Sequence, residues 1–203
     1  MFVGCGSSDI SEGVAKNDYP ITINGVTLNS QPTGVAVLSQ NIADVILTGG
    51  FEATLKAKSE DCTQEDLSIL TIDDVQEMKN LGVTLVLVDA APTEQQTAAL
   101  EAQGIQVLAI SPAKSRDDCK RLYREVGSAM VGGNTGYTKG EKACDNVFYT
   151  LDDITRLVPS TGTQYTACYL YDLEGHVATG NSLFGSLISY AGFFNSFGNE
   201  LNN

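Results

Sequence analysis

A continuous run of apolar residues at positions 83–88, VTLVLV, constrains the fold more than any other feature of the sequence. Because polar residues do not alternate with apolar ones in this run, it predicts a strand that is covered on both faces. A second such run, IQVLAI at 105–110, follows a helix whose start is marked by Thr93 and Gln96 at the spacing of a capping box. Buried strands separated by helices predict right-handed βαβ units and a mostly parallel sheet.

The segment before these strands continues the same alternation. Asn24-Gly25, between the apolar residues 21–23 and 26–28, predicts a hairpin with a two-residue type I′ turn. Residues 34–39, GVAVLS, predict a short buried strand, and Gly49-Gly50 ends the helix expected at 41–48. The other elements expected here are a strand at 54–59, a short helix at 63–70, and a helix that runs to residue 80 from a variant capping box formed by Thr71 and Asp74.

The pattern changes after Pro112. Two helices are expected at 114–130 and 137–157, separated by the glycine-rich residues 131–136. A stripe of apolar residues at helical spacing is expected to pack the second helix against the sheet: Ala143, Val147, Leu151, Ile154 and Val158. A second β-rich segment follows, with a strand at 165–171, a turn at 172–175 and a helix at 182–191.

A lobe with so few strands cannot bury its apolar side chains, which include Phe193, Phe194 and Phe197. We therefore expect the second lobe to be incomplete. The prediction is an α/β fold with an anchor remnant and flexible tether at 1–17 and an N-terminal lobe with a parallel sheet and flanking helices at 18–112. Connecting helices, one of them long, follow at 113–160, and 161–203 form the start of an incomplete second α/β lobe.

Composition excludes several classes of function. The formal net charge is −13 with only 12 Lys and Arg residues, so the protein repels phosphate backbones, and nucleic acid is an unfavourable partner. His176 is the single histidine, which excludes a metal site built from several imidazoles. The sequence has neither a G-x-S-x-G elbow nor a phosphate-binding G-x-x-x-x-G-K-[ST] loop. We expect no catalytic residue, metal or cofactor, although an enzyme that uses the sheet as a cofactor platform stays open as an alternative.

The cysteines suggest the cellular compartment. Cys5 follows Phe-Val-Gly and precedes a small polar run, as at the lipidation site of a bacterial lipoprotein, although an accidental Gly-Cys pair is the alternative. If Cys5 carries lipid, the chain lies outside the cytoplasm, where disulfides persist. Cys119 and Cys144 lie at similar distances from the glycine-rich turn and are expected to form a disulfide, which leaves Cys62 and Cys168 as a weaker pair. Buried free thiols are the alternative.

The order of these parts resembles the class III solute-binding proteins, the siderophore, haem and cobalamin receptors in which one long helix joins two α/β lobes. The resemblance rests on Tyr19-Pro20 before the first strand, Pro32 before GVAVLS, a helix that ends in Gly-Gly, the long helix at 137–157 and the helix at 181–192. It implies an extracytoplasmic lipoprotein, anchored through Cys5, that delivers its ligand to an ABC permease. Asp44 matches the position of a permease-docking acid, and Ser186 stands at the matching position of the second lobe, where it cannot form an ion pair.

Ligands of open parallel sheets bind outside the carboxyl ends of the strands. The cations nearest that edge are expected to pair with an anionic ferric siderophore or to be solvated loop charges, and His176 is expected to be a turn residue rather than a haem ligand. The ligand is expected to be an iron-siderophore, haem or a corrinoid, and the 203-residue form is expected to bind it poorly or not at all. A transport-incompetent surface or signalling remnant of the family is the alternative. The residues predicted to line the cleft are Ser39, Gln40, Asn41, Lys58, Asp89, Lys114, Arg116, Tyr169, Tyr171, His176 and Asn181.

Overall fold

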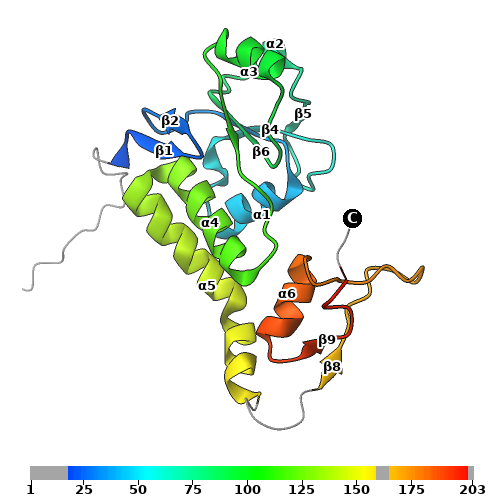
Figure 1. The fold of residues 1–203 in the computed structure, drawn as a ribbon. Helices are drawn as coiled ribbons and strands as arrows, with labels where there is room; N and C mark the ends of the chain where they lie inside the picture. The colour runs from blue at the N-terminus through cyan, green and yellow to red at the C-terminus, as the bar shows by residue number, and fades with distance from the viewer. Residues whose placement is uncertain (1–17, 159–164, 201–203) are drawn as a thin grey trace, which may run out of the picture.

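The computed structural model describes residues 18–158 and 165–200 of the chain. An N-terminal α/β lobe lies at one end of a long helix, α5 (Gly133–Leu157), and a smaller C-terminal lobe lies beside the other end (Figure 1). Among the described helices, none is long and apolar enough to cross a membrane.

The N-terminal lobe is built on a five-stranded sheet in which every neighbouring pair is parallel. The strand order is β5-β4-β3-β6-β7, so that β3, the first strand of this sheet along the chain, lies at its centre. This sheet confirms the α/β prediction and the two apolar runs that carried it. The strands are β3 (Val35–Val37), β4 (Leu55–Lys58), β5 (Ser68–Ile69), β6 (Leu85–Val88) and β7 (Gln106–Ala109).

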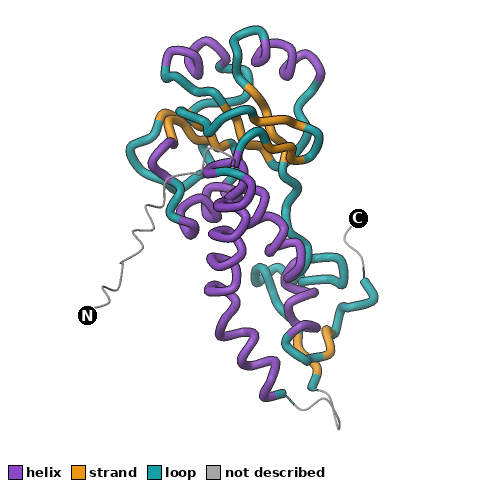
Figure 2. Tube along the Cα trace, turned by 90° about the vertical axis from the view of Figure 1, so that its left-hand side faces the viewer, coloured by secondary structure: helices purple, strands orange, loops and turns teal. Residues whose placement is uncertain are grey.

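Helices cover both faces of the sheet, as Figure 2 shows. In β6, Leu85 and Leu87 belong to the apolar cluster formed with α1 (Gln40–Gly49) and α4 (Arg116–Val131). Val86 and Val88 point to the opposite cluster, which includes Met78 of α2 (Val75–Asn80) and Leu100 of α3 (Glu94–Glu101). Because successive side chains of a strand alternate between faces, a strand with helices on both sides must be apolar throughout.

Local turn signals were largely correct. β1 (Ile21–Ile23) and β2 (Val26–Leu28) form the predicted antiparallel hairpin, with positive φ at Asn24 and Gly25. Gly50 ends α1 in the left-handed conformation. Thr93 and Gln96 form a complete capping box at the start of α3.

The segment between β4 and α2 differs from the prediction. The helix expected at 63–70 is wrong, because Ser68 and Ile69 pair with β4 as a parallel edge strand. The capping box expected at Thr71 and Asp74 is wrong as well. The Thr71 backbone N–H and side chain both donate to Asp74 Oδ2 at 2.7 Å, which closes a turn before α2, and the helix begins only at Val75.

Helices α4 and α5 pack against each other at very short distance. Only Gly132 separates them, so the loop expected at 131–136 is wrong for most of its length. A Cβ atom added to Gly136 would lie 1.9 Å from the carbonyl oxygen of Gly127, and one added to Gly140 would lie 2.1 Å from that of Tyr123. Glycine is therefore required where the two backbones meet.

The apolar stripe predicted for α5 is also partly wrong. Val147 and Ile154 are 53% and 43% exposed, because α5 packs mainly on α4 rather than on the sheet. The buried side of α5 is displaced by about one residue from the predicted stripe, since it is set by the glycines that approach α4. It consists of Gly136, Gly140, Ala143, Cys144 and Phe148.

The C-terminal lobe contains α6 (Leu183–Tyr190) and the short parallel pair β8 (Thr166–Ala167) and β9 (Phe194–Asn195). The strand expected at 165–171 is reduced to β8 and to one antiparallel bridge between Leu170 and Val177. Leu183 and Leu187 pack against the core cluster that contains α4, whereas Phe194 stays 55% exposed.

The expected disulfides are not formed. Cys62, Cys119, Cys144 and Cys168 are free thiols, and the first three are buried. The Sγ of Cys144 instead accepts a hydrogen bond from the Arg116 guanidinium, whose Nη1 lies 3.2 Å away. Cys5 lies outside the described residues.

Candidate functional site

A pocket of about 770 Å³ opens at the carboxyl ends of β3, β4, β5 and β6. This is the edge of a parallel sheet where ligands bind, and the volume lies within the usual range of ligand sites. The pocket is lined by Leu38, Ser59, Glu60, Asp61, Ile69, Leu70, Thr71, Ile72, Asp74, Val88, Asp89, Ala90, Ala91, Pro92 and Gln96.

The polar part of this lining consists largely of carboxylates that neighbouring hydroxyl groups hold in place. Ser39 Oγ donates to Asp89 Oδ2 at 3.0 Å, and Thr71 donates twice to Asp74. Hydrogen bonds from Thr71 lower the pKa of Asp74, and one from the Ser59 side chain lowers the pKa of Asp61. Asp61 and Asp74 therefore carry full negative charge at neutral pH.

The residues predicted for the N-terminal wall follow β3 and β6. Asp89 lines the pocket. Ser39 is buried and does not line the pocket itself, but its hydroxyl group donates a hydrogen bond to Asp89. The side chain of Gln40 forms hydrogen bonds with neighbouring protein groups and does not line the pocket. Its Nε2 donates to Asp44, and its Oε1 accepts from the backbone N–H of Thr63 at 2.7 Å. Asn41 is exposed on α1 and does not line the pocket.

The three predicted cleft cations do not line the pocket. Lys58 Nζ donates to the Cys62 carbonyl oxygen at 2.7 Å, and Lys114 is exposed at the loop before α4. Arg116 is buried and pairs with Asp145 at 3.1 Å and Asp152 at 3.5 Å. The two Nη atoms of Arg116 thus hold α4 to α5 and do not face the pocket.

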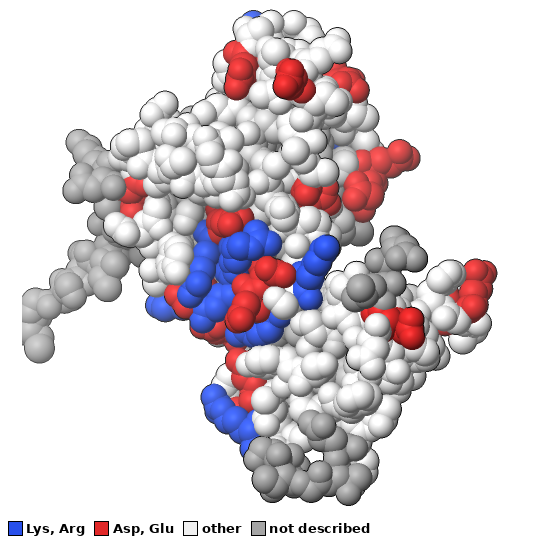
Figure 3. All heavy atoms as spheres, in the orientation of Figure 1, with Lys and Arg blue, Asp and Glu red and all other residues white. Residues whose placement is uncertain are grey.

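The basic residues of the protein are concentrated away from the pocket. Four of them lie in α4 and three in α5, out of 12 in the chain. Figure 3 shows this band of Lys and Arg across the face formed by the two helices, mixed with acidic residues. Ion pairs such as Lys120–Glu141 at 2.8 Å and Arg124–Glu141 at 2.6 Å link the helices within the band.

In the C-terminal lobe, the predicted tyrosines form an exposed aromatic group with Phe184. The rings of Tyr169 and Phe184 stack in parallel at 4.2 Å between centroids, and Tyr171 meets both edge-on. Asn181 lies just before α6, where its Oδ1 accepts from Thr179 at 2.8 Å. Residues 169 to 184 thus bring flat apolar surface and a few polar groups onto one lobe.

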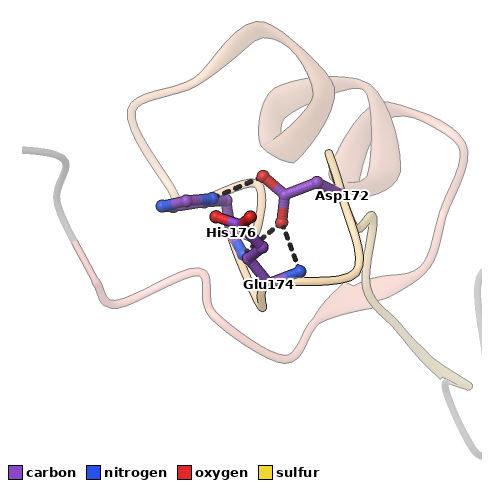
Figure 4. A group of neighbouring side chains, drawn as sticks. All are labelled: Asp172, Glu174 and His176. Atoms are coloured by element: carbon purple, nitrogen blue, oxygen red, sulfur yellow. Dashed lines mark hydrogen bonds and ion pairs between the residues drawn. The ribbon is translucent and has the colours of Figure 1, made fainter.

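His176 lies in a turn of the C-terminal lobe, as expected (Figure 4). Asp172 accepts hydrogen bonds from the backbone N–H groups of Glu174 and His176 and contacts Nδ1 of the imidazole. The bond to His176 lowers the pKa of Asp172. Ligand atoms of the three side chains lie within 4.8 Å of one another, but all three are exposed and their mutual bonds close the turn.

Contacts of α6 with α5 fix the C-terminal lobe. The Tyr190 hydroxyl donates to Asp152 at 3.1 Å, and Thr155 Oγ1 donates to the Tyr190 carbonyl oxygen at 3.2 Å. Asp152 also pairs with Arg116, so one carboxylate connects α4, α5 and α6.

Sequence reasoning missed the contribution of β5 to the pocket. Thr71, Ile72 and Asp74 follow this strand and line the pocket. They were not predicted to do so, because residues 63–70 were assigned to a helix. The β-branched run Ile69-Leu-Thr-Ile72 was the available signal for a strand.

Comparisons with known proteins identify the fold. No family model and no curated protein matches the sequence. Solved structures do match, and among them are a possible iron-binding periplasmic solute-binding protein from Staphylococcus epidermidis and the periplasmic haem-binding proteins RhuT from Roseiflexus and HutB from Vibrio cholerae. Their TM-scores are 0.62, 0.59 and 0.64, at 13%, 20% and 17% sequence identity. This chain has the class III solute-binding protein fold.

The match confirms the predicted fold and covers 84% of this chain in each of the three cases. The chain spans 69%, 67% and 68% of the length of these solute-binding proteins. Neither the ligand nor the importer follows from similarity at this level of identity, because one fold serves many ligands.

Proposed function

We propose that the chain is the extracytoplasmic substrate-binding component of an ABC importer. In this proposal it captures an iron-siderophore, haem or cobalamin-type ligand between its two lobes and delivers it to the permease. The observation that carries the proposal is the pocket of about 770 Å³ at the carboxyl ends of four parallel strands, within the fold of haem- and iron-binding receptors.

The chemistry of both lobes supports a large, partly apolar ligand. Leu38, Leu70 and Val88 give the pocket an apolar wall beside its carboxylates. Tyr169, Tyr171 and Phe184 offer exposed ring faces on the other lobe, suited to a macrocycle or a chelate.

The contacts outside the cleft are part of the same proposal. Asp44 is exposed on α1, where it is available to dock onto a basic permease surface. Ser186 on α6 supplies no such charge, so we propose that docking depends mainly on the N-terminal lobe. Cys5 is the proposed lipid anchor.

A titration of the 203-residue chain with a ligand panel tests the proposal. The panel consists of haemin, ferric hydroxamate and catecholate siderophores, cyanocobalamin, zinc and manganese, observed by tyrosine fluorescence and, for haemin, by the Soret band. The chain has eight tyrosines and no tryptophan, so quenching of the intrinsic fluorescence reports on the tyrosines, which include Tyr169 and Tyr171. We expect saturable binding of a chelate or macrocycle. Tight binding of free zinc or manganese, without a response to any of the others, would contradict the proposal.

A further inference from the structure

We propose that the pocket of the N-terminal lobe selects its ligand by charge, and that it takes a chelate or corrin that presents a positive charge or amine and amide donors. Ligands with several negative charges are disfavoured. This inference rests on the proposed function and narrows the ligand class that the same site accepts.

The first argument is the charge of the lining. Glu60 and Asp61 follow β4, Asp74 follows β5, and Asp89 follows β6, so carboxylates enter the pocket from three strand ends. Among the described residues that line the pocket, there is no Lys, Arg or His. Glu60, Asp61 and Asp74 are exposed and Asp89 is half-buried, so the four carboxylates repel an anionic ligand partly through water, and added salt weakens this repulsion.

The second argument is that these charges are not neutralised within the protein. None of the four carboxylates forms an ion pair in the described part of the chain. The nearby Lys58 gives its ammonium to the Cys62 carbonyl oxygen, and Arg116 is consumed between α4 and α5. Two of the three predicted cleft cations are therefore committed to other contacts, and the third, Lys114, is exposed and does not line the pocket.

The third argument is that the carboxylates are preorganised as acceptors. Asp89 is held by Ser39 and Asp74 by Thr71. Each carboxylate keeps further lone pairs for ligand N–H or O–H groups, since an ionised carboxylate accepts about four hydrogen bonds. Apolar contact with Leu38, Leu70 and Val88 then accommodates the body of the ligand.

These features separate the proposed ligands from one another. A ferric trihydroxamate with a pendant ammonium group, or a corrin rich in amides, matches both the carboxylates and the apolar wall. A tricatecholate chelate brings three negative charges to the same site. A porphyrin dicarboxylate fits only if its carboxylates point away from the N-terminal lobe.

NMR titration of the 203-residue chain with three gallium(III) chelates tests the inference. Gallium replaces iron at the same charge without paramagnetic broadening, and the probes are desferrioxamine B (monocationic), desferrichrome (neutral) and enterobactin (trianionic). We expect the monocation to bind at least about tenfold more tightly than the trianion, a difference of about 1.4 kcal/mol. This ratio should fall as salt is added, because screening weakens the repulsion.

Two matched variants locate the effect. The double variant Asp61→Asn, Asp74→Asn removes two pocket charges and keeps one acceptor oxygen in each side chain, so it should reduce the ratio about tenfold. Glu52→Gln with Glu101→Gln removes the same charge at exposed sites outside the pocket and should leave the ratio unchanged within about twofold. Equal or tighter binding of the trianion by the unmodified chain would overturn the inference and leave the proposed function intact. If none of the three chelates perturbs the pocket, and neither haemin nor cyanocobalamin of the ligand panel binds the chain, the proposed function fails and the inference fails with it.

Discussion

Replacing Gly136 by alanine tests whether the close contact of α4 and α5 holds the framework of the protein. The added Cβ would lie 1.9 Å from the Gly127 carbonyl oxygen, 2.3 Å from its carbonyl carbon and 2.7 Å from the backbone nitrogen of Ser128. All three are backbone atoms, so no side chain can rotate away. Since an ordinary contact needs at least 3.4 Å, the helices must separate locally by about 1.5 Å.

The cost follows from two opposing effects. Overpacking costs about 1–3 kcal/mol, and the rigid backbone neighbours place Gly136→Ala at the upper end of that range. Alanine favours a helix interior over glycine by about 1 kcal/mol, which offsets part of the cost. We therefore expect the variant to lose about 2 kcal/mol of unfolding free energy, or about 4–8 °C in Tm for a chain of this size.

Urea unfolding followed by circular dichroism measures this loss. Asn146→Ala is the matched control, because Asn146 is exposed on the same helix and the change also favours helix formation. The control should be unchanged or slightly more stable. A Gly136→Ala variant as stable as the control would show that α4 and α5 do not rely on this contact.

Three further predictions concern buried polar and ionisable groups. Arg116→Met should lower the free energy of unfolding, measured in urea, by about 2 kcal/mol. This loss is smaller than that for a fully buried ion pair, because Asp145 and Asp152, which lose their partner, are partly hydrated. Arg156→Met, which breaks an exposed pair, should change stability by less than about 1 kcal/mol, and equal losses for the two would contradict the assigned role of Arg116. Burial raises the pKa of Cys119 to about 11 from its ordinary 9.0, so its contribution to stability is complete below pH 9 and is lost as pH rises through 11. Between about pH 9 and pH 11, the free energy of unfolding of Cys119→Ala should therefore fall less steeply with pH than that of the unmodified chain. Identical slopes for the two proteins would refute the raised pKa of Cys119. In a Cys5→Ser background, Cys168 alone of the described cysteines should react with Ellman's reagent before unfolding, whereas rapid reaction of a second thiol would contradict the burial of the other three.

The parallel sheet could be predicted because its strands are buried on both faces and read as continuous apolar runs. The β5 edge strand was missed, since it is two residues long and the polar residues before it fit a helix, although the run Ile69-Leu-Thr-Ile72 favours a strand. The start of α5 was missed because glycines usually end helices, whereas here Gly136 and Gly140 lie inside one. Their role depends on the backbone of α4, and no local pattern records that contact.

The edge of the sheet that forms the site was predictable from topology, but the partners of its charges were not. Asp89 lines the pocket because it directly follows a buried strand. Arg116 comes after the loop that follows the last strand, yet its guanidinium pairs with Asp145 of α5, which lies 29 residues further along the chain. Such contacts between residues far apart in the sequence decide whether a basic side chain in a loop can bind a ligand or instead joins two helices.

The central claim, that this chain is a solute receptor that binds at the carboxyl edge of its sheet, is tested most directly by mapping a bound chelate on the assigned NMR spectrum. Gallium desferrioxamine B should shift the amides of residues 59–61 and 88–91, which line the pocket there. A second pocket, of about 310 Å³, lies near the amino ends of β6 and β7 beside Thr84 and Gly104, and it serves as the internal control. We predict shifts at the carboxyl edge with none at Thr84 or Gly104. Shifts confined to the amino edge would contradict the account.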